Sequence, residues 1–106
     1  MLNTAPVPEL SILLPDGSAK VIPLSGSRIT IGRTSDNDFA FPDEAILSRR
    51  HVAIEYDGAR WFIEDLGSKN GTTFNSEPLT GRRAFQLGDK IGVGRMVLSL
   101  VDPNLN

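Results

Sequence analysis

The chain has 106 residues, of which 40% are hydrophobic and 23% charged, and its formal net charge is −2. This length suits one domain with a single core, and this composition is typical of a folded globular protein rather than a disordered one. The slight excess of acidic residues disfavours non-specific nucleic-acid binding, which depends on an excess of Lys and Arg.

Cysteine is absent and histidine occurs once. Disulfides, thiolate chemistry and cysteine-based zinc sites are therefore excluded, and a single histidine argues against a histidine-based metal centre. We expect no metal and no other cofactor. No apolar run approaches the roughly 20 residues that span a membrane, and residues 1–6 lack the basic start and apolar core of a signal peptide. A cytoplasmic location is the default expectation.

Short apolar runs separated by turn residues predict strands from the beginning of the chain. Residues 9–14 and 20–24 form the first expected hairpin, because Pro15-Asp16-Gly17-Ser18 is a typical tight turn. Pro23 removes a backbone donor, which places the second strand at a sheet edge. Residues 28–31 alternate with a period of two, as a half-buried strand does.

The same pattern continues to the end of the chain without a convincing helical segment. The further strands that we expect are 38–41, 51–56, 60–64, 72–74, 83–87, 90–93 and 95–101. Asp57-Gly58 predicts a hairpin, residues 77–81 a turn, and Gly88-Asp89 a break between two strands. Many short strands, ten glycines and seven prolines indicate an all-β sandwich or barrel. We expect one domain over residues 9–102, with tails at 1–8 and 103–106.

Polar residues gather in three of the predicted loops. Ser48-Arg49-Arg50-His51 combines a hydroxyl, two guanidinium groups and the only histidine. Arg offers a planar fork of N–H donors that suits phosphate oxygens, and Ser adds a short neutral donor. Gly32-Arg33 upstream and Ser68-Lys69-Asn70-Gly71-Thr72 downstream are its expected partners. Our hypothesis is that the three loops converge on one bound phosphate.

The order and spacing of these pieces carry a family likeness. Gly32-Arg33, then Ser48-Arg49-x-His51, then Asn70-Gly71-Thr72 resembles a forkhead-associated (FHA) domain over about residues 9–102. Trp61-x-Ile63-x-Asp65-Leu66 and Leu87-Gly88-Asp89 fit the same pattern. The resemblance implies a two-sheet β sandwich of about eleven strands, with the binding loops at one end. It also implies recognition of phosphothreonine peptides, since this family belongs to the readers of phosphorylated motifs.

The resemblance also assigns roles to individual residues. It implies phosphate contacts for Arg33, Ser48, Arg49 and Lys69. Many relatives carry a small hydroxyl residue where this chain has Lys69, whose flexible ammonium would act as a point charge. Asn70 would hydrogen-bond the peptide backbone beside the phosphothreonine. The residues expected to be scaffold for the loops are Gly32, His51, Gly71 and Thr72.

The leading interpretation is a non-catalytic phosphothreonine-binding module in Ser/Thr kinase signalling, whose partner is a kinase or its substrate. The alternative is an assembly domain of the same fold that binds protein without phosphate. Catalysis by Ser48 with His51 is disfavoured, because no third member and no G-x-S-x-G motif accompanies them. Residues 36–38 lack the remaining ligands of a calcium loop, so we expect a turn there. The arginines expected at the solvated surface are Arg50, Arg82 and Arg83.

Overall fold

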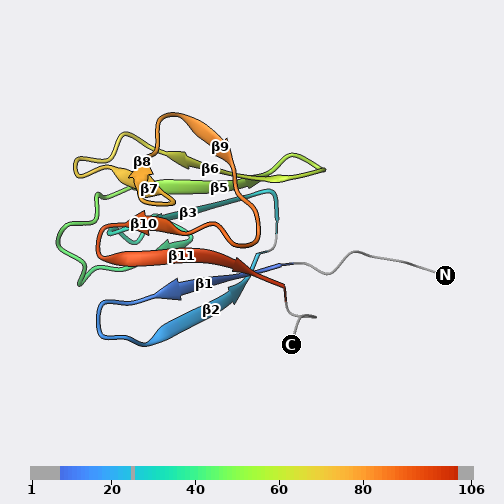
Figure 1. Ribbon diagram of the computed structural model, residues 1–106. Coiled ribbons are helices and arrows are strands. Elements are labelled where there is room, and N and C mark those ends of the chain that lie inside the picture. Colours follow the sequence, from blue (N-terminus) through green and yellow to red (C-terminus); the bar gives the residue numbers. More distant parts are fainter. Residues whose placement is uncertain (1–7, 25, 103–106) are drawn as a thin grey trace.

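The computed structural model describes residues 8–24 and 26–102, and it contains eleven strands in two sheets (Figure 1). Within these residues there is no helix, and therefore no helix able to cross a membrane. The predicted all-β sandwich is confirmed. Ser25 and the expected tails, apart from Pro8, lie outside the described residues.

The larger sheet has six strands in the order β2-β1-β11-β10-β7-β8, and every neighbouring pair is antiparallel. Its members are β1 (Glu9–Leu13), β2 (Ala19–Pro23), β7 (Thr72–Phe74), β8 (Glu77–Pro78), β10 (Ile91–Val93) and β11 (Met96–Val101). The strand that contains Pro23 lies at an edge, as predicted, where its missing N–H interrupts no ladder.

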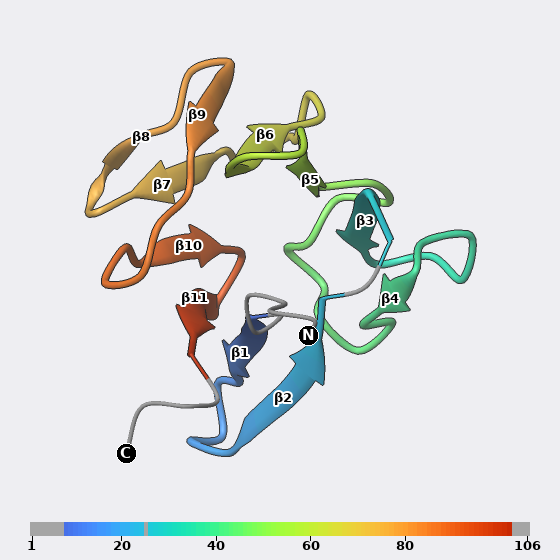
Figure 2. The same ribbon diagram turned by 90° about the vertical axis from the view of Figure 1, so that its right-hand side faces the viewer.

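The smaller sheet has five strands in the order β4-β3-β5-β6-β9. Its members are β3 (Arg28–Gly32), β4 (Phe39–Ala40), β5 (Val52–Tyr56), β6 (Trp61–Asp65) and β9 (Arg82–Ala84). Only β3 and β4 run parallel; the other pairs of this sheet are antiparallel. Figure 2 shows the two sheets facing each other around a shared interior.

The core lies between the sheets and follows the alternation of the sequence. Met96, Leu98 and Leu100 of β11 are all buried and form the inward face of the last strand. From the opposite sheet, Ile54 and Ile63 are fully buried. Burial of such side chains is the main favourable contribution to folding, about 1.5–3 kcal/mol for each. Trp61 is half-buried, packs against this core and lies 4.9 Å from the Tyr56 ring centre.

The predicted strand at 83–87 is too long, because the chain changes sheets there. β9 ends at Ala84, and Phe85 is buried. The Gln86 N–H donates to Asp89 Oδ2 at 2.9 Å, and the Asp89 N–H donates to the Gln86 carbonyl at 3.1 Å. These bonds close a turn at Gln86–Asp89. The strands on either side of the turn therefore belong to different sheets, and residues 77–78, expected as turn, form the short strand β8.

The two arginines expected as a solvated pair also cover aromatic rings. The guanidinium of Arg82 lies 3.8 Å from the ring centre of Phe62, and that of Arg83 lies 4.2 Å from the ring centre of Phe74. Both side chains remain exposed. Stacking of a guanidinium on an aromatic face shields the ring and adds about 0.5–1 kcal/mol at an exposed site.

The topology brings three loops to one end of the sandwich. β5 lies between β3 and β6, and it pairs Val52 with Ile31 at the end of β3 and with Asp65 at the end of β6. The end of β3, the start of β5 and the end of β6 are therefore neighbours. The loops that leave them, residues 33–38, 41–51 and 66–71, lie together on the left of Figure 1. We call these the three site loops.

Candidate functional site

The first site loop begins at Gly32, where the backbone of the second loop approaches closely. A Cβ at position 32 would clash with the Arg49 carbonyl oxygen and would lie 2.7 Å from Asn37 Nδ2. Only glycine fits this approach without movement of the backbone. The next residue is fixed twice, since the Arg33 N–H donates to the Ser48 carbonyl and its Nε donates to the Leu47 carbonyl, both at 3.0 Å.

Asn37 is a buried link between the first and second site loops, and the sequence interpretation missed it. Its Nδ2 donates to the Thr34 carbonyl at 2.8 Å and to the Arg49 carbonyl at 2.6 Å. Only 8% of the residue is exposed, which is unusual for an asparagine in a polar loop. The one signal in the sequence was its position in a Thr-Ser-Asp-Asn loop, where side chains often bond nearby backbone.

The His51 side chain joins the second and third site loops. It is fully buried, its Nδ1 accepts the Ser48 N–H at 3.1 Å, and its Nε2 lies 2.9 Å from the Gly71 carbonyl oxygen. A ring nitrogen that accepts an N–H carries no proton, so the bonding pattern assigns a neutral ring with its proton on Nε2, donating to Gly71. Gly71 itself has a φ of +80°, a conformation that favours glycine.

The Asp65 carboxylate organises the third site loop from within. It accepts hydrogen bonds from the N–H groups of Gly67 and Ser68, both at 2.8 Å. Two hydroxyls also donate to it, from Ser68 at 2.5 Å and from Thr72 at 2.6 Å. Burial alone would raise the pKa of the Asp65 carboxyl, but the bonds from Ser68 and Thr72 outweigh it and lower that pKa below its usual value.

Two further hydrogen bonds connect the second loop directly to the third. The Lys69 N–H donates to Ser48 Oγ at 2.9 Å, and the Asn70 Nδ2 donates to the Ile46 carbonyl at 2.8 Å. Ser48 Oγ thus uses one lone pair inside the protein and keeps its proton for a further acceptor. The Asn70 side-chain oxygen accepts no hydrogen bond from the described part of the chain, so it can accept one from a ligand.

Each of the three site loops also contributes a cationic side chain. Arg33 is half-exposed, and Arg49 and Lys69 are exposed. Within residues 8–24 and 26–102, none of the three forms an ion pair with a carboxylate. Arg50, expected at the surface, is exposed and does have one, with Asp36 at 3.6 Å. The structure therefore brings Arg33, Ser48, Arg49, Lys69 and Asn70 to one end, with their backbones fixed and donor groups unused.

The carboxylates of the turn at residues 36–38 accept hydrogen bonds from the protein and do not form a cation site. The Thr34 hydroxyl donates to the Asp36 carboxylate, and this bond is the main reason that the pKa of Asp36 is lowered, with Arg50 nearby as a further cause. Asp38 instead accepts the Thr30 N–H at 2.8 Å. No group of three or more metal-binding side chains occurs in the described residues.

The comparisons with known proteins decide the family. The model of the family described as "FHA domain" matches residues 29–94, which is more than half of the chain and includes all three site loops. The chain belongs to the FHA domain family. The match begins in β3 and ends just after β10, so it contains every residue that the sequence singled out for the site.

Individual relatives of this FHA domain come from several organisms. It is 39% identical over 81 residues to the FHA domain-containing protein FhaA of Mycobacterium tuberculosis, an alignment that covers 76% of this chain and 15% of that protein. It is 34% identical over 107 residues to the oxoglutarate dehydrogenase inhibitor of Corynebacterium glutamicum, covering 91% of this chain and 73% of that protein. The chain thus spans only a small part of the longer relatives.

Solved structures agree with the fold of this FHA domain. A structure from a study of phosphothreonine-dependent FHA domain interactions has a TM-score of 0.76 and 34% identity, covering 92% of this chain and 99% of that one. The FhaA FHA domain, solved with the intracellular domain of a second protein, has a TM-score of 0.73 and 35% identity, covering 86% and 98%. FHA domains bind phosphothreonine peptides as non-enzymatic modules.

Proposed function

We propose that this FHA domain is a non-catalytic, cytoplasmic module that binds phosphothreonine peptides through Arg33, Ser48, Arg49, Lys69 and Asn70. The observation that carries the proposal is the bond from the Lys69 N–H to Ser48 Oγ at 2.9 Å. It holds two loops together at the point where the unpaired cations gather. The hydroxyl proton of Ser48 is then available to a phosphate oxygen, and so are the ammonium and guanidinium groups of the same loops.

The charge of the ligand matches this arrangement. Phosphothreonine carries about −1.5 to −2 charges at neutral pH and has three strong acceptor oxygens. Each charge-assisted hydrogen bond contributes about 1.5–3 kcal/mol, whereas association costs about 4–15 kcal/mol. Four such contacts at the upper end of their range contribute about 12 kcal/mol. With an association cost at the lower end, about 4 kcal/mol, the affinity is near −8 kcal/mol, which is about micromolar. That affinity suits a reversible signalling contact.

The bonding of His51 supports a non-catalytic role. Its Nδ1 already accepts the Ser48 backbone N–H, and its Nε2 already donates to the Gly71 carbonyl. A general base for Ser48 would need a ring nitrogen free to accept the hydroxyl proton. Both nitrogens are used to hold loops together, so the ring serves as a structural link.

Relatives indicate the class of partner. Homologous FHA proteins take part in Ser/Thr kinase signalling, and one neighbour, EmbR of Mycobacterium tuberculosis, is solved with a phosphopeptide. It has a TM-score of 0.75 and 27% identity, covering 89% of this chain and 24% of that one. We infer that the partner of this chain is a Ser/Thr kinase or a substrate of one, recognised through a phosphorylated threonine.

A phosphothreonine peptide library, tested beside its unphosphorylated copy, examines this proposal. The wild-type domain should bind only phosphorylated members, and the double variant Ser48→Ala/Arg49→Ala should bind none. Arg50→Ala is a matched control, because Arg50 is adjacent but already paired with Asp36, and it should bind as the wild type does. Equal binding to both copies would instead support the phosphate-independent assembly domain.

A further inference from the structure

A second hollow lies at the same end of the sandwich, beside the site loops. It is a groove of about 340 Å³, which is within the range of small ligand pockets, about 300–1,000 Å³. One wall is the turn after β1, with Leu14, Pro15 and Asp16, together with Lys20 of β2. The other wall is the start of the second site loop, residues 40–44. Nothing in the phosphate site described above uses these residues.

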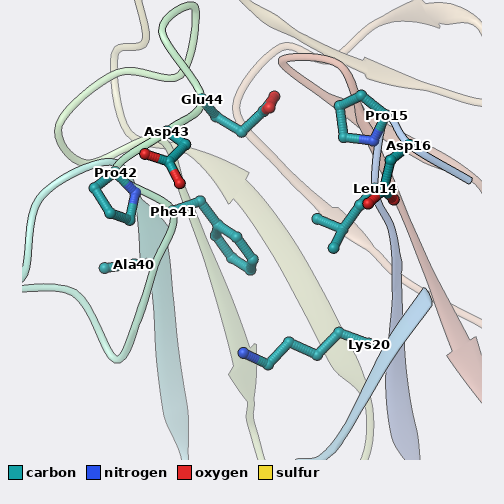
Figure 3. Close-up of a pocket in the computed structure, with 9 residues that line it drawn as sticks. All are labelled: Leu14, Pro15, Asp16, Lys20, Ala40, Phe41, Pro42, Asp43 and Glu44. Atoms are coloured by element: carbon teal, nitrogen blue, oxygen red, sulfur yellow. The ribbon is translucent and has the colours of Figure 1, made fainter. Parts of the chain in front are cut away.

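The groove combines an aromatic face with acidic side chains. Figure 3 shows the Phe41 ring between the two walls, with the carboxylates of Asp16, Asp43 and Glu44 around one end and Lys20 at the other. Hydrogen bonds from the Ser18 hydroxyl and N–H lower the pKa of Asp16, so this carboxylate is charged at neutral pH. Asp43 is exposed, and no side chain or backbone group in the described chain bonds its carboxylate.

One carboxylate oxygen of Glu44 lacks a hydrogen-bond donor, which is an independent indication of a ligand. The residue is 8% exposed, and its Oε1 accepts Arg95 Nη2 at 3.1 Å. Its Oε2 is buried and has no hydrogen-bond partner among the described residues. A buried carboxylate oxygen without a donor is costly, and such oxygens in proteins are nearly always satisfied. Glu44 lines the groove (Figure 3), and rotation of its side chain would present Oε2 to a donor bound there.

The arrangement suits an organic cation better than a metal ion. The three carboxylates are divided between the two walls, and no group of metal-binding side chains close enough to hold an ion occurs in the described residues. A guanidinium or ammonium can instead donate to Glu44 and Asp43 at the acidic end of the groove. The Phe41 ring is not free for this cation, because Lys20 Nζ already lies 5.8 Å from the ring centre. Arg in particular presents several donors that suit two carboxylates at once.

The groove lies within reach of a peptide held at the phosphate site. Glu44 and Ser48 are four residues apart, so their Cα atoms are separated by at most about 14 Å. The Leu47 N–H donates to the Glu44 carbonyl at 3.1 Å, which closes this segment into a turn and shortens the separation. An extended peptide advances about 3.3 Å per residue. A bound peptide therefore needs at most roughly four residues to span this separation.

We propose that this groove is a subsite for one Lys or Arg side chain of the phosphorylated partner, a few residues from its phosphothreonine. The proposal rests on the phosphothreonine-binding function proposed above and adds a preference to it. The domain then reads two opposite charges at a fixed separation: a phosphate at the site loops and a cation at the acidic groove.

The test uses synthetic peptides with a central phosphothreonine in an alanine and serine background. A single arginine is moved through the flanking positions, and each peptide is paired with a copy that carries citrulline, the neutral analogue of arginine, at that position. Affinities are measured by fluorescence polarisation. In the wild type, one position or two neighbouring positions should favour arginine by about fivefold, the effect expected of one or two partly exposed ion pairs.

Three variants identify the groove as the source of this preference. Glu44→Gln and Asp43→Asn should each lower the arginine-to-citrulline ratio toward one, while the peptide without arginine binds them as it binds the wild type. Asp43→Asn should fold as the wild type does, since the described structure shows no bond to the Asp43 carboxylate. A lower ratio in this variant therefore cannot be due to misfolding. Arg95 pairs with Glu44 but does not line the groove. Arg95→Ala should therefore keep the preference for arginine over citrulline.

The possible failures can be told apart. If phosphopeptides bind but the ratio is flat, or if it persists in both acidic-residue variants, the subsite is refuted and the proposed function stands. If no phosphopeptide binds at any position, the proposed function itself fails and the subsite fails with it.

Discussion

The backbone N–H of Lys69 donates a hydrogen bond to the side-chain oxygen of Ser48, at 2.9 Å and across 21 residues of sequence. This bond joins the loop that precedes β5 to the loop that precedes β7, two strands of different sheets. Because Ser48 Oγ is the acceptor in this bond, its hydroxyl proton remains available to a ligand. The end of the sandwich is thereby organised before any ligand arrives, which lowers the entropic cost of binding.

Arg33→Ala should weaken phosphothreonine-peptide binding by about ten- to hundredfold, because it removes one charge-assisted contact. The Arg33 Nε bond to the Leu47 carbonyl fixes the stem of the side chain and leaves its terminal nitrogens free for the phosphate. Isothermal titration gives the affinity. Arg50→Ala, tested in parallel, should change it by less than about twofold. Unchanged affinity for Arg33→Ala would remove this residue from the site.

His51→Ala should lower the free energy of unfolding by about 2–5 kcal/mol, as measured by urea denaturation. The Ser48 N–H and the Gly71 carbonyl both lose their partner, and a buried side chain is replaced by a cavity. Phosphopeptide affinity should fall as well, since the second and third loops are no longer joined. A variant with wild-type stability would show that the imidazole link contributes little.

Asn37→Ala should reduce stability by about 1–3 kcal/mol, because the carbonyl groups of Thr34 and Arg49 lose their shared donor. Its effect on binding is predicted to be several-fold, since the Arg49 backbone is released although the Arg49 side chain is intact. Asn37→Asp keeps the size of the side chain but replaces the donor with an acceptor, and it should be at least as damaging. If both variants bind phosphopeptide normally, Asn37 does not position Arg49.

The strands were largely predictable from the sequence, whereas several contacts between distant segments were not. Alternation at Met96, Leu98 and Leu100 marks a buried face directly, because a strand has a period of two. In residues 28–31 it marks the strand correctly, but Thr30 on the opposite face is buried as well, so this strand is not half-buried. The roles of Asn37 and Arg83 depend on partners that only folding brings near, the Arg49 carbonyl and the Phe74 ring. A polar loop and an arginine pair look the same in sequence whether or not such partners exist.

The sequence also did not indicate to which of the two sheets a strand belongs. Residues 83–87 contain apolar side chains suited to a strand, yet the chain leaves the smaller sheet after Ala84. The reason is the closed turn between Gln86 and Asp89, which carries the chain to the larger sheet. The candidate site residues were found because their order and spacing form a family pattern, while the bonds that join their loops required the structure.

Asp65 predicts a specific dependence of stability on pH. Its pKa is lower in the folded chain than the unfolded value of about 3.9, so it stabilises the fold fully above that value. This contribution is lost as the pH falls below about 4 and through the lower folded pKa. Urea denaturation from neutral to acidic pH should therefore show a smaller loss of stability for Asp65→Asn than for the wild type.

Asp43→Asn is the control for that experiment, because the described structure shows no bond to its carboxylate. It should follow the wild-type pH dependence closely. At neutral pH, Asp65→Asn should also be less stable than the wild type, since the third loop loses a charged acceptor shared by four donors. Identical curves for wild type and Asp65→Asn would contradict this role of the carboxylate.

The most direct test of the whole account is an NMR titration of the labelled domain with a phosphothreonine peptide and with its unphosphorylated copy. We predict that the phosphorylated peptide shifts the amide signals of the three site loops, above all Arg33, Ser48, Arg49, Lys69 and Asn70, and that the unphosphorylated copy leaves them unchanged. Shifts confined to the outer face of the six-stranded sheet, or equal shifts with both peptides, would contradict the account.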